Sequence, residues 1–193
     1  MGSCAIDMYV HVPAAWLGMA GWTGIAAASL VQLVWRHPLA GIAARAVAVP
    51  GALFTVICLV TGSLWGRPTW GTYWEWDGRM TSMLILLFLY IGYIALADAD
   101  QDRGGEGRIT AIFGLVGAIN IPIIRFSVEW SNSLHQQSIS FTSGGSSIDS
   151  SMLWPLFGSS LGFLLLFGAI VLMRMRAMLA RQKIEGRLRR LGA

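Results

Sequence analysis

Charged residues are scarce in this chain of 193 residues, because Asp, Glu, Lys and Arg together make up only 12% of it. A soluble domain usually carries about 25% charged residues. Apolar residues instead make up 55%, and the mean hydropathy is +0.60. This balance excludes an ordinary soluble domain and indicates that the lipid bilayer is the solvent for most of the chain.

Cysteine and nucleotide-binding motifs are also scarce. The two cysteines, Cys4 and Cys58, form neither a CxxC motif nor a metal-ligand spacing, so we expect neither to be functional. The chain contains no GxxxxGK[ST] phosphate-binding loop, which excludes ATP hydrolysis of the P-loop kind. The N-terminus lacks a basic stretch followed by an apolar core and a small-residue cleavage site, so we expect no cleavable signal peptide.

Long apolar stretches are what the chain does contain. A helix crosses the hydrocarbon in about 20 residues, and five stretches have about this length: 14–35, 44–64, 80–97, 109–128 and 153–173. Helices are expected because lipid offers no partner for open backbone groups. Asn120 and Pro122 are expected to loosen the fourth span near its outer end. The sequence predicts an all-α, polytopic transmembrane helix bundle that forms one domain over residues 1–193.

Lysine and arginine predict the orientation of the bundle. Seven of the fourteen lie in the segment 174–193, directly after the last apolar stretch. Such clusters favour the cytoplasmic side, and we interpret this one as an anchor, with no nucleic-acid partner. We therefore predict a bacterial inner-membrane protein with a cytoplasmic C-terminus and a periplasmic N-terminus. The N-terminal tail with His11, the loop 65–79 and the connection with His135 would then share the periplasmic face.

The loop 65–79 holds four of the nine tryptophans, namely Trp65, Trp70, Trp74 and Trp76. Tryptophan favours membrane interfaces, but four indoles in one short loop exceed what anchoring needs. Three residues are expected to prevent one continuous helix here: Gly66, Pro68 and Gly71. Trp70 and Trp74 would share a face if the second half of the loop is helical. The loop fits a platform for a flat, apolar, aromatic ligand.

The three histidines divide between the two predicted faces. His11 and His135 lie on the face of the tryptophans, whereas His37 lies beside Pro38 on the cytoplasmic face and is expected to be solvated. A neutral imidazole is a good axial ligand of haem iron. Two imidazoles could grip the iron from opposite sides while the indoles hold the porphyrin. No histidine is expected inside a span.

Cationic side chains near the same face are candidates for pairing with haem propionates: Arg67, Arg79 and Arg125. Arg125 lies in the apolar part of the fourth span, where charge is expensive. It could instead snorkel to the headgroups or pair with Glu129 one helical turn away. Asp77 could pair with Arg79 or cap the third span, whose N-terminus favours an acid.

The stretch WGRPTWGTYWEWDGRMTS resembles the tryptophan-rich "WWD" signature of haem-handling proteins. The segments HVPAA at His11, NIPII from Asn120 and SVEWSNSLHQ around His135 resemble the CcmC family, haem exporter protein C of system I cytochrome c biogenesis. The resemblance covers nearly the whole chain. It implies that haem b is bound without a covalent bond at the periplasmic face, with His11 and His135 on the iron and the four tryptophans around the ring.

The resemblance also implies partners and a role. The partners would be the haem chaperone CcmE, which receives the haem, the ABC-transporter subunits CcmA and CcmB, and the small membrane protein CcmD. The chain would be a carrier and presenter of haem and not an enzyme. Family members usually have six spans, one more than predicted here. Ser131 stands where the family commonly has a tryptophan after Trp130, which would weaken the platform near His135.

Two other functions stay open. A haem–protein lyase of a related c-type assembly system is the first, although such relatives are usually larger and carry histidines within spans. A small-solute transporter is the second, and it would need paired charges or broken helices near the midplane.

Overall fold

The computed structural model describes residues 2–102, 107–130 and 150–192. Six helices follow one another: α1 (Gly2–Trp35), α2 (Ala40–Trp70), α3 (Gly78–Asp102), α4 (Arg108–Gly117), α5 (Asn120–Trp130) and α6 (Ser150–Arg190). None of the described residues lies in a strand. Five stretches are long and apolar enough to cross a membrane, which confirms the prediction of an all-α, multi-span protein.

The helices extend further than the apolar runs that predicted them. The five stretches are Met8–Trp35, Ala40–Trp70, Gly78–Asp100, Arg108–Glu129 and Ser151–Arg190. Helix α6, for example, continues through the basic segment to Arg190, because arginine and lysine are good helix formers. The prediction that His11 lies in an N-terminal tail is wrong. Helix α1 begins at Gly2 and continues through His11 and Pro13.

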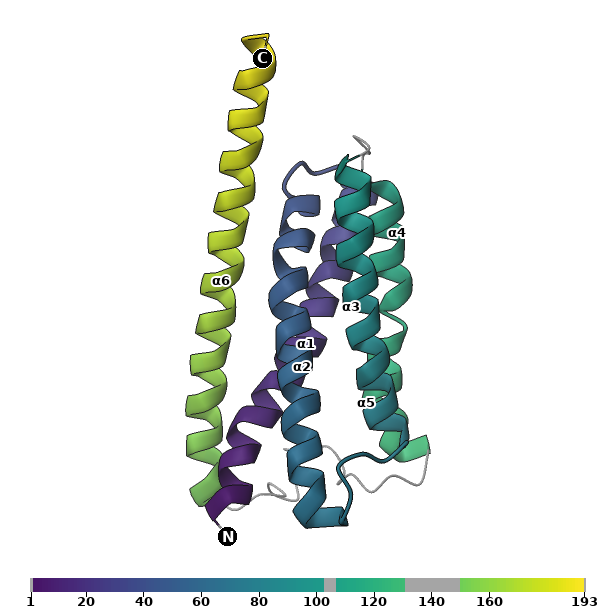
Figure 1. Cartoon of the computed structure of the whole chain (residues 1–193), viewed down its shortest axis with the longest axis vertical. Coiled ribbons are helices and arrows are strands. Elements are labelled where there is room, and N and C mark those ends of the chain that lie inside the picture. Colours follow the sequence, from purple (N-terminus) through teal and green to yellow (C-terminus); the bar gives the residue numbers. More distant parts are fainter. Residues whose placement is uncertain (1, 103–106, 131–149, 193) are drawn as a thin grey trace.

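Helices α1 to α5 pack together, and α6 lies along one side of them and extends beyond them at its C-terminal end (Figure 1). The N-terminus, the α2–α3 connection and the start of α6 lie at one end of the bundle. We call this the tryptophan end, after Trp65–Trp76. The α1–α2 connection and the start of α4 lie at the other end, which we call the basic end after Arg36, Arg45 and Arg108.

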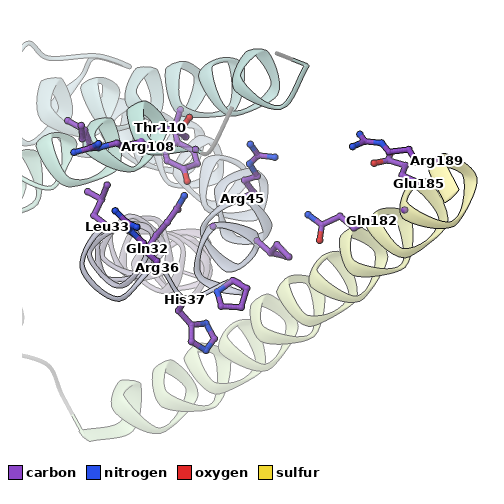
Figure 2. A pocket seen from close by; sticks show the side chains of 17 residues that line it. Gln32, Leu33, Arg36, His37, Arg45, Arg108, Thr110, Gln182, Glu185 and Arg189 are labelled. Atoms are coloured by element: carbon purple, nitrogen blue, oxygen red, sulfur yellow. The ribbon is translucent and has the colours of Figure 1, made fainter. Parts of the chain in front are cut away.

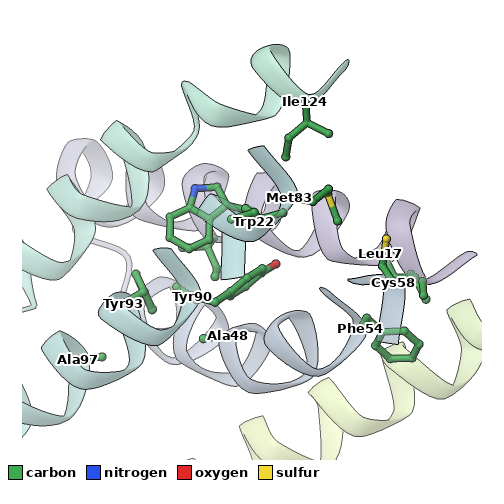
Figure 3. Close-up of a cluster of buried hydrophobic side chains, with 14 residues drawn as sticks. Leu17, Trp22, Ala48, Phe54, Cys58, Met83, Tyr90, Tyr93, Ala97 and Ile124 are labelled. Atoms are coloured by element: carbon green, nitrogen blue, oxygen red, sulfur yellow. The ribbon is translucent and has the colours of Figure 1, made fainter. Parts of the chain in front are cut away.

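Aromatic side chains form the centre of the core. Trp22 is fully buried, and its ring meets those of Tyr90, Tyr93 and Phe113 edge to face at centroid distances of 5.0, 6.0 and 6.3 Å, as Figure 3 shows for the first two. The Tyr90 hydroxyl donates a hydrogen bond of 2.7 Å to the Gly18 carbonyl. These contacts join α1, α3 and α4 at the centre of the core.

The fourth predicted span is broken, but the break lies mid-span and not near its outer end. Residues 118–119 separate α4 from α5. Pro122 has no N–H to offer the Ala118 carbonyl, which instead accepts a bond of 3.1 Å from the Ile121 N–H. The Asn120 side-chain amide donates to the Ser82 carbonyl at 2.9 Å. This bond ties α5 to α3 next to the tryptophan end.

Candidate haem-holding site

The tryptophan loop is half helical. The loop is not one continuous helix, as predicted, but Gly66 and Pro68 do not interrupt it, because α2 continues through both as far as Trp70. Gly71 ends it, with φ at 81° and its N–H on the Arg67 carbonyl at 3.0 Å, a conformation that favours glycine. Because residues 71–77 are not helical, Trp70 and Trp74 do not share a helical face.

The four indoles lie in two pairs. Trp65 and Trp70 meet edge to face at 5.5 Å, and Trp74 and Trp76 meet in the same way at 5.4 Å. The Thr72 hydroxyl donates to the Trp74 carbonyl at 3.0 Å and accepts from the Trp74 N–H at 3.3 Å, which fixes the turn between the pairs. Trp76 is 74% exposed. The arrangement leaves aromatic surface open at this end of the bundle.

His11 is held by α2 through one ring nitrogen. Its Nδ1 lies 2.9 Å from the Cys58 carbonyl oxygen and 3.1 Å from the Thr61 hydroxyl. A carbonyl can only accept a hydrogen bond, so Nδ1 carries the proton. The lone pair of the neutral imidazole is then on Nε2. Histidines that bind metals commonly have their other ring nitrogen engaged in this way, which fixes both the tautomer and the ring orientation.

Gly62 gives the His11 ring its room. A Cβ at this position would lie 2.9 Å from His11 Cε1. Cys58, Thr61, Gly62 and Trp65 have the spacing i, i+3, i+4 and i+7, which places them on one face of α2. Trp65 therefore follows the His11 contact by about one turn, or about 5.4 Å along the helix axis. The structure thus brings His11 and Trp65, whose ring meets that of Trp70, to the same end of α2.

His37 has its proton on the other ring nitrogen from His11. Its Nδ1 accepts a hydrogen bond of 3.3 Å from the Leu39 N–H, so the neutral ring carries its proton on Nε2. The side chain is exposed at the basic end, in line with its predicted solvation. Of the two histidines in the described part of the chain, His11 therefore has its lone pair on Nε2 and His37 has its lone pair on Nδ1.

The predicted cationic residues lie at the tryptophan end on three different elements. The Arg67 guanidinium lies 5.1 Å from the Tyr73 ring centre, and that of Arg125 lies 5.8 Å from the Phe126 ring centre. Arg79, at the start of α3, lies within electrostatic range of Arg125 and of Asp77. These three arginines place cationic groups near the indoles, together with the acidic Glu75 and Asp77 of the same loop.

Asp77 has both of the structural roles that its position predicts. Its carboxylate accepts a hydrogen bond of 2.7 Å from the Met80 N–H, which caps the N-terminus of α3. It also interacts electrostatically with Arg79. The side chain is 7% exposed, so Asp77 organises the base of the loop and presents little surface of its own.

Two of the predicted features lie outside the described residues, namely His135 and Ser131. The second axial ligand therefore stays a prediction. Conversely, the sequence reasoning missed Thr61, Gly62 and the role of the Cys58 carbonyl. A threonine and a glycine together inside an apolar run were the available signal, because small and hydroxyl-bearing residues mark close helix contacts in membranes.

Comparison with known proteins gives matches over nearly the whole chain. The profile of the family described as "CcmC: Heme exporter protein C" matches residues 2–190. A "Heme exporter protein C" of Bradyrhizobium diazoefficiens is 52% identical over 184 residues, which cover 95% of this chain and 70% of that protein.

Two further relatives show how far the similarity extends. The "Heme exporter protein C" of Escherichia coli strain K12 is 52% identical over 169 residues, 88% of this chain and 68% of that protein. A "Putative cytochrome c biosynthesis ccmC-like mitochondrial protein" of Marchantia polymorpha is 44% identical over 169 residues, 88% of this chain and 71% of that protein. The profile match includes His11, its partners on α2 and the tryptophan loop.

Proposed function

This chain belongs to the Heme exporter protein C family, and from that premise we propose that it binds haem without a covalent bond at its tryptophan end and presents it to the haem chaperone CcmE. The family places the chain in haem handling for cytochrome c biogenesis. Haem is then a cargo that must be held and later released.

The arrangement of His11 is the observation that carries the proposal. The bond from Nδ1 to the Cys58 carbonyl leaves Nε2 as the nitrogen with the lone pair, which is what an axial ligand needs. The flat, apolar porphyrin fits the two indole pairs one turn further along α2. Arg67, Arg79 and Arg125 can pair with the propionates, because guanidinium groups donate charge-assisted hydrogen bonds to carboxylates.

In this proposal each residue has a distinct role. His11 and His135 are the axial ligands of haem b, and Trp65, Trp70, Trp74 and Trp76 cover the ring. Arg67, Arg79 and Arg125 hold the propionates. Asp77 is a positioning residue, because it caps α3 and thereby fixes the end of the loop.

The indoles alone hold the haem only weakly, which suits a cargo that is later released. One indole can bury about 150–250 Å², so four rings that are about half covered by the ligand bury about 300–500 Å² of their own surface. At about 25 cal/mol per Å² the gross gain is about 8–12 kcal/mol. Loss of translational and rotational freedom takes back about 4–15 kcal/mol. Iron ligation therefore decides whether haem stays bound.

The membrane setting follows from the charges. The chain is a multi-pass membrane protein, and we place the basic end in the cytoplasm because lysine and arginine favour that side. The tryptophan end then faces the periplasm of a bacterial inner membrane. The family name indicates an ABC-type haem exporter system. Within it we propose CcmA and CcmB as the transporter subunits and CcmD as a small membrane partner.

A haem–protein lyase is the second candidate. His11 lies near the start of Met8–Trp35, a helix long and apolar enough to cross a membrane, so the prediction that no histidine lies inside a span stays a prediction. The carrier role makes a specific prediction: the purified chain does not attach haem to a CxxCH peptide, whereas a lyase does.

Visible spectroscopy of the detergent-purified protein tests the proposal. Haem held by two histidines gives a sharp Soret band, which we expect to collapse in His11→Ala and in His135→Ala. His37→Ala is the matched control and should keep the band, because its ring lies at the basic end. An unchanged band in His11→Ala, or an equal loss in all three variants, would contradict the proposed site.

A further inference from the structure

A cavity opens at the basic end, far from the tryptophan loop. Its volume is about 980 Å³. Residues of the α1–α2 connection, the start of α4 and the C-terminal part of α6 line it (Figure 2). Four arginines from four separate segments lie around it: Arg36, Arg45, Arg108 and Arg189.

The rule that lysine and arginine favour the cytoplasmic side does not by itself explain why these arginines surround one cavity. That rule needs positive charge on the cytoplasmic side, but it does not need charges from four segments to surround one space. Arg45 is half-buried on α2, and Figure 2 shows it between Arg108 on one side and Arg189 on the other. Glu185 is the acidic side chain in the lining, and it pairs with Arg181 at 2.8 Å. The lining therefore carries a net positive charge, although the buried Asp100 carboxylate lies next to Gly107 in the same wall.

A buried hydroxyl adds a polar group to the same wall. Thr110 lines the cavity and is 3% exposed, and its Oγ1 has no hydrogen-bond partner among the described residues. A buried polar atom without a partner is uncommon in native proteins. Guanidinium groups and a hydroxyl are donors that match the oxygens of a phosphate group.

We propose that this cavity binds a phosphate group, supplied either by an anionic phospholipid headgroup or by a soluble phosphate. The cavity lies where α1 ends and where α2 and α4 begin, which is the level of headgroups in a bundle of spans. Basic pockets between membrane helices bind anionic headgroups in this way. His37 also lines the cavity, but its Nδ1 accepts from the Leu39 N–H, which argues against iron ligation there.

Native mass spectrometry of the detergent-purified full chain tests this proposal. The probes are cardiolipin, phosphatidylglycerol and phosphatidylcholine, each titrated with and without inorganic phosphate. One variant carries Arg45→Gln and Arg108→Gln. The matched control carries Arg187→Gln and Arg190→Gln, two exposed arginines of α6 outside the lining of this cavity.

The wild type should retain the anionic lipids in preference to phosphatidylcholine. Affinity should fall roughly fivefold for each arginine removed from the cavity, and it should stay within about twofold in the control. Because Arg45 is half-buried, Arg108→Gln is also measured alone, with helix content checked by circular dichroism. Retention of lipid in the presence of inorganic phosphate supports the headgroup as source, and displacement by inorganic phosphate supports a soluble one.

Two results would overturn the proposal. One is equal weakening in the cavity variant and the control variant, which would mean that only overall charge matters. The other is the absence of any preference for anionic lipids together with no effect of inorganic phosphate. Neither result depends on haem, so the test is independent of the function proposed for the tryptophan end.

Discussion

Replacing Gly62 by alanine should weaken haem binding while leaving the fold intact or slightly more stable. The new Cβ would lie 2.9 Å from His11 Cε1, whereas ordinary contacts begin at 3.4 Å. The imidazole must therefore move by about 0.5 Å. A glycine in a helix interior is less stable than alanine by about 0.5–1 kcal/mol, so the substitution itself favours α2.

The effect on haem follows from the His11 hydrogen bond. A shift of about 0.5 Å lengthens the 2.9 Å contact between Nδ1 and the Cys58 carbonyl beyond the usual range for hydrogen bonds. Such a bond contributes about 0.5–1.5 kcal/mol. Loss of an outer partner of a metal-binding histidine typically lowers metal affinity about 10–100-fold. We expect about tenfold weaker haem binding.

The assay is a titration of the detergent-purified protein with haem, followed at the Soret band, alongside thermal unfolding by circular dichroism. Gly24→Ala is the matched control, because a Cβ there meets nothing within 4 Å and the residue lies on α1 with His11. The two readouts should move in opposite directions in Gly62→Ala. Wild-type affinity in this variant would refute the idea that Gly62 and the Cys58 carbonyl position the His11 ring.

Three further substitutions test neighbouring parts of the account. Thr61→Val removes the 3.1 Å contact to His11 but keeps the Cys58 bond, so haem titration should show a loss of only about threefold. Trp65→Ala should cost roughly 2 kcal/mol of haem affinity. The control is Trp154→Ala on α6, where the indole is 81% exposed, and it should cost nothing in the same titration. Equal losses in the two variants would contradict the proposal that the loop indoles bind the porphyrin. Asp77→Ala removes the cap on α3 and should lower the free energy of unfolding by about 1 kcal/mol. Asp77→Asn can still cap the helix and should keep the wild-type stability. Thermal unfolding of both variants checks this.

The spans could be predicted because hydrophobic length is a property of the sequence alone. All five apolar stretches proved to be helical, the fourth with a break at residues 118–119, and the cap at Asp77 followed from its place before the third stretch. The helix ends could not be predicted in this way. Pro13, Gly66 and Pro68 lie inside helices. Pro13 and Gly66 are buried, so packing against neighbouring helices outweighs their local preference of a few kcal/mol.

The candidate site was predictable in composition but not in geometry. The four indoles and His11 were evident as a set of residue types that suit haem. Which nitrogen of His11 carries the proton depends on Cys58, which is 47 positions away in the sequence. Only the packing of α1 on α2 brings these residues together, and no local pattern encodes that register. For the same reason the role of Gly62 became visible only in the structure.

The central claim is that His11 binds the haem iron through Nε2, and chemical rescue tests it most directly. Removal of the ring in His11→Gly should abolish the six-coordinate, low-spin spectrum of the haem-loaded protein, and added imidazole should restore it by occupying the vacated space beside Gly62. If His11→Gly kept the wild-type spectrum, or if imidazole failed to restore the lost one, His11 would not be an iron ligand.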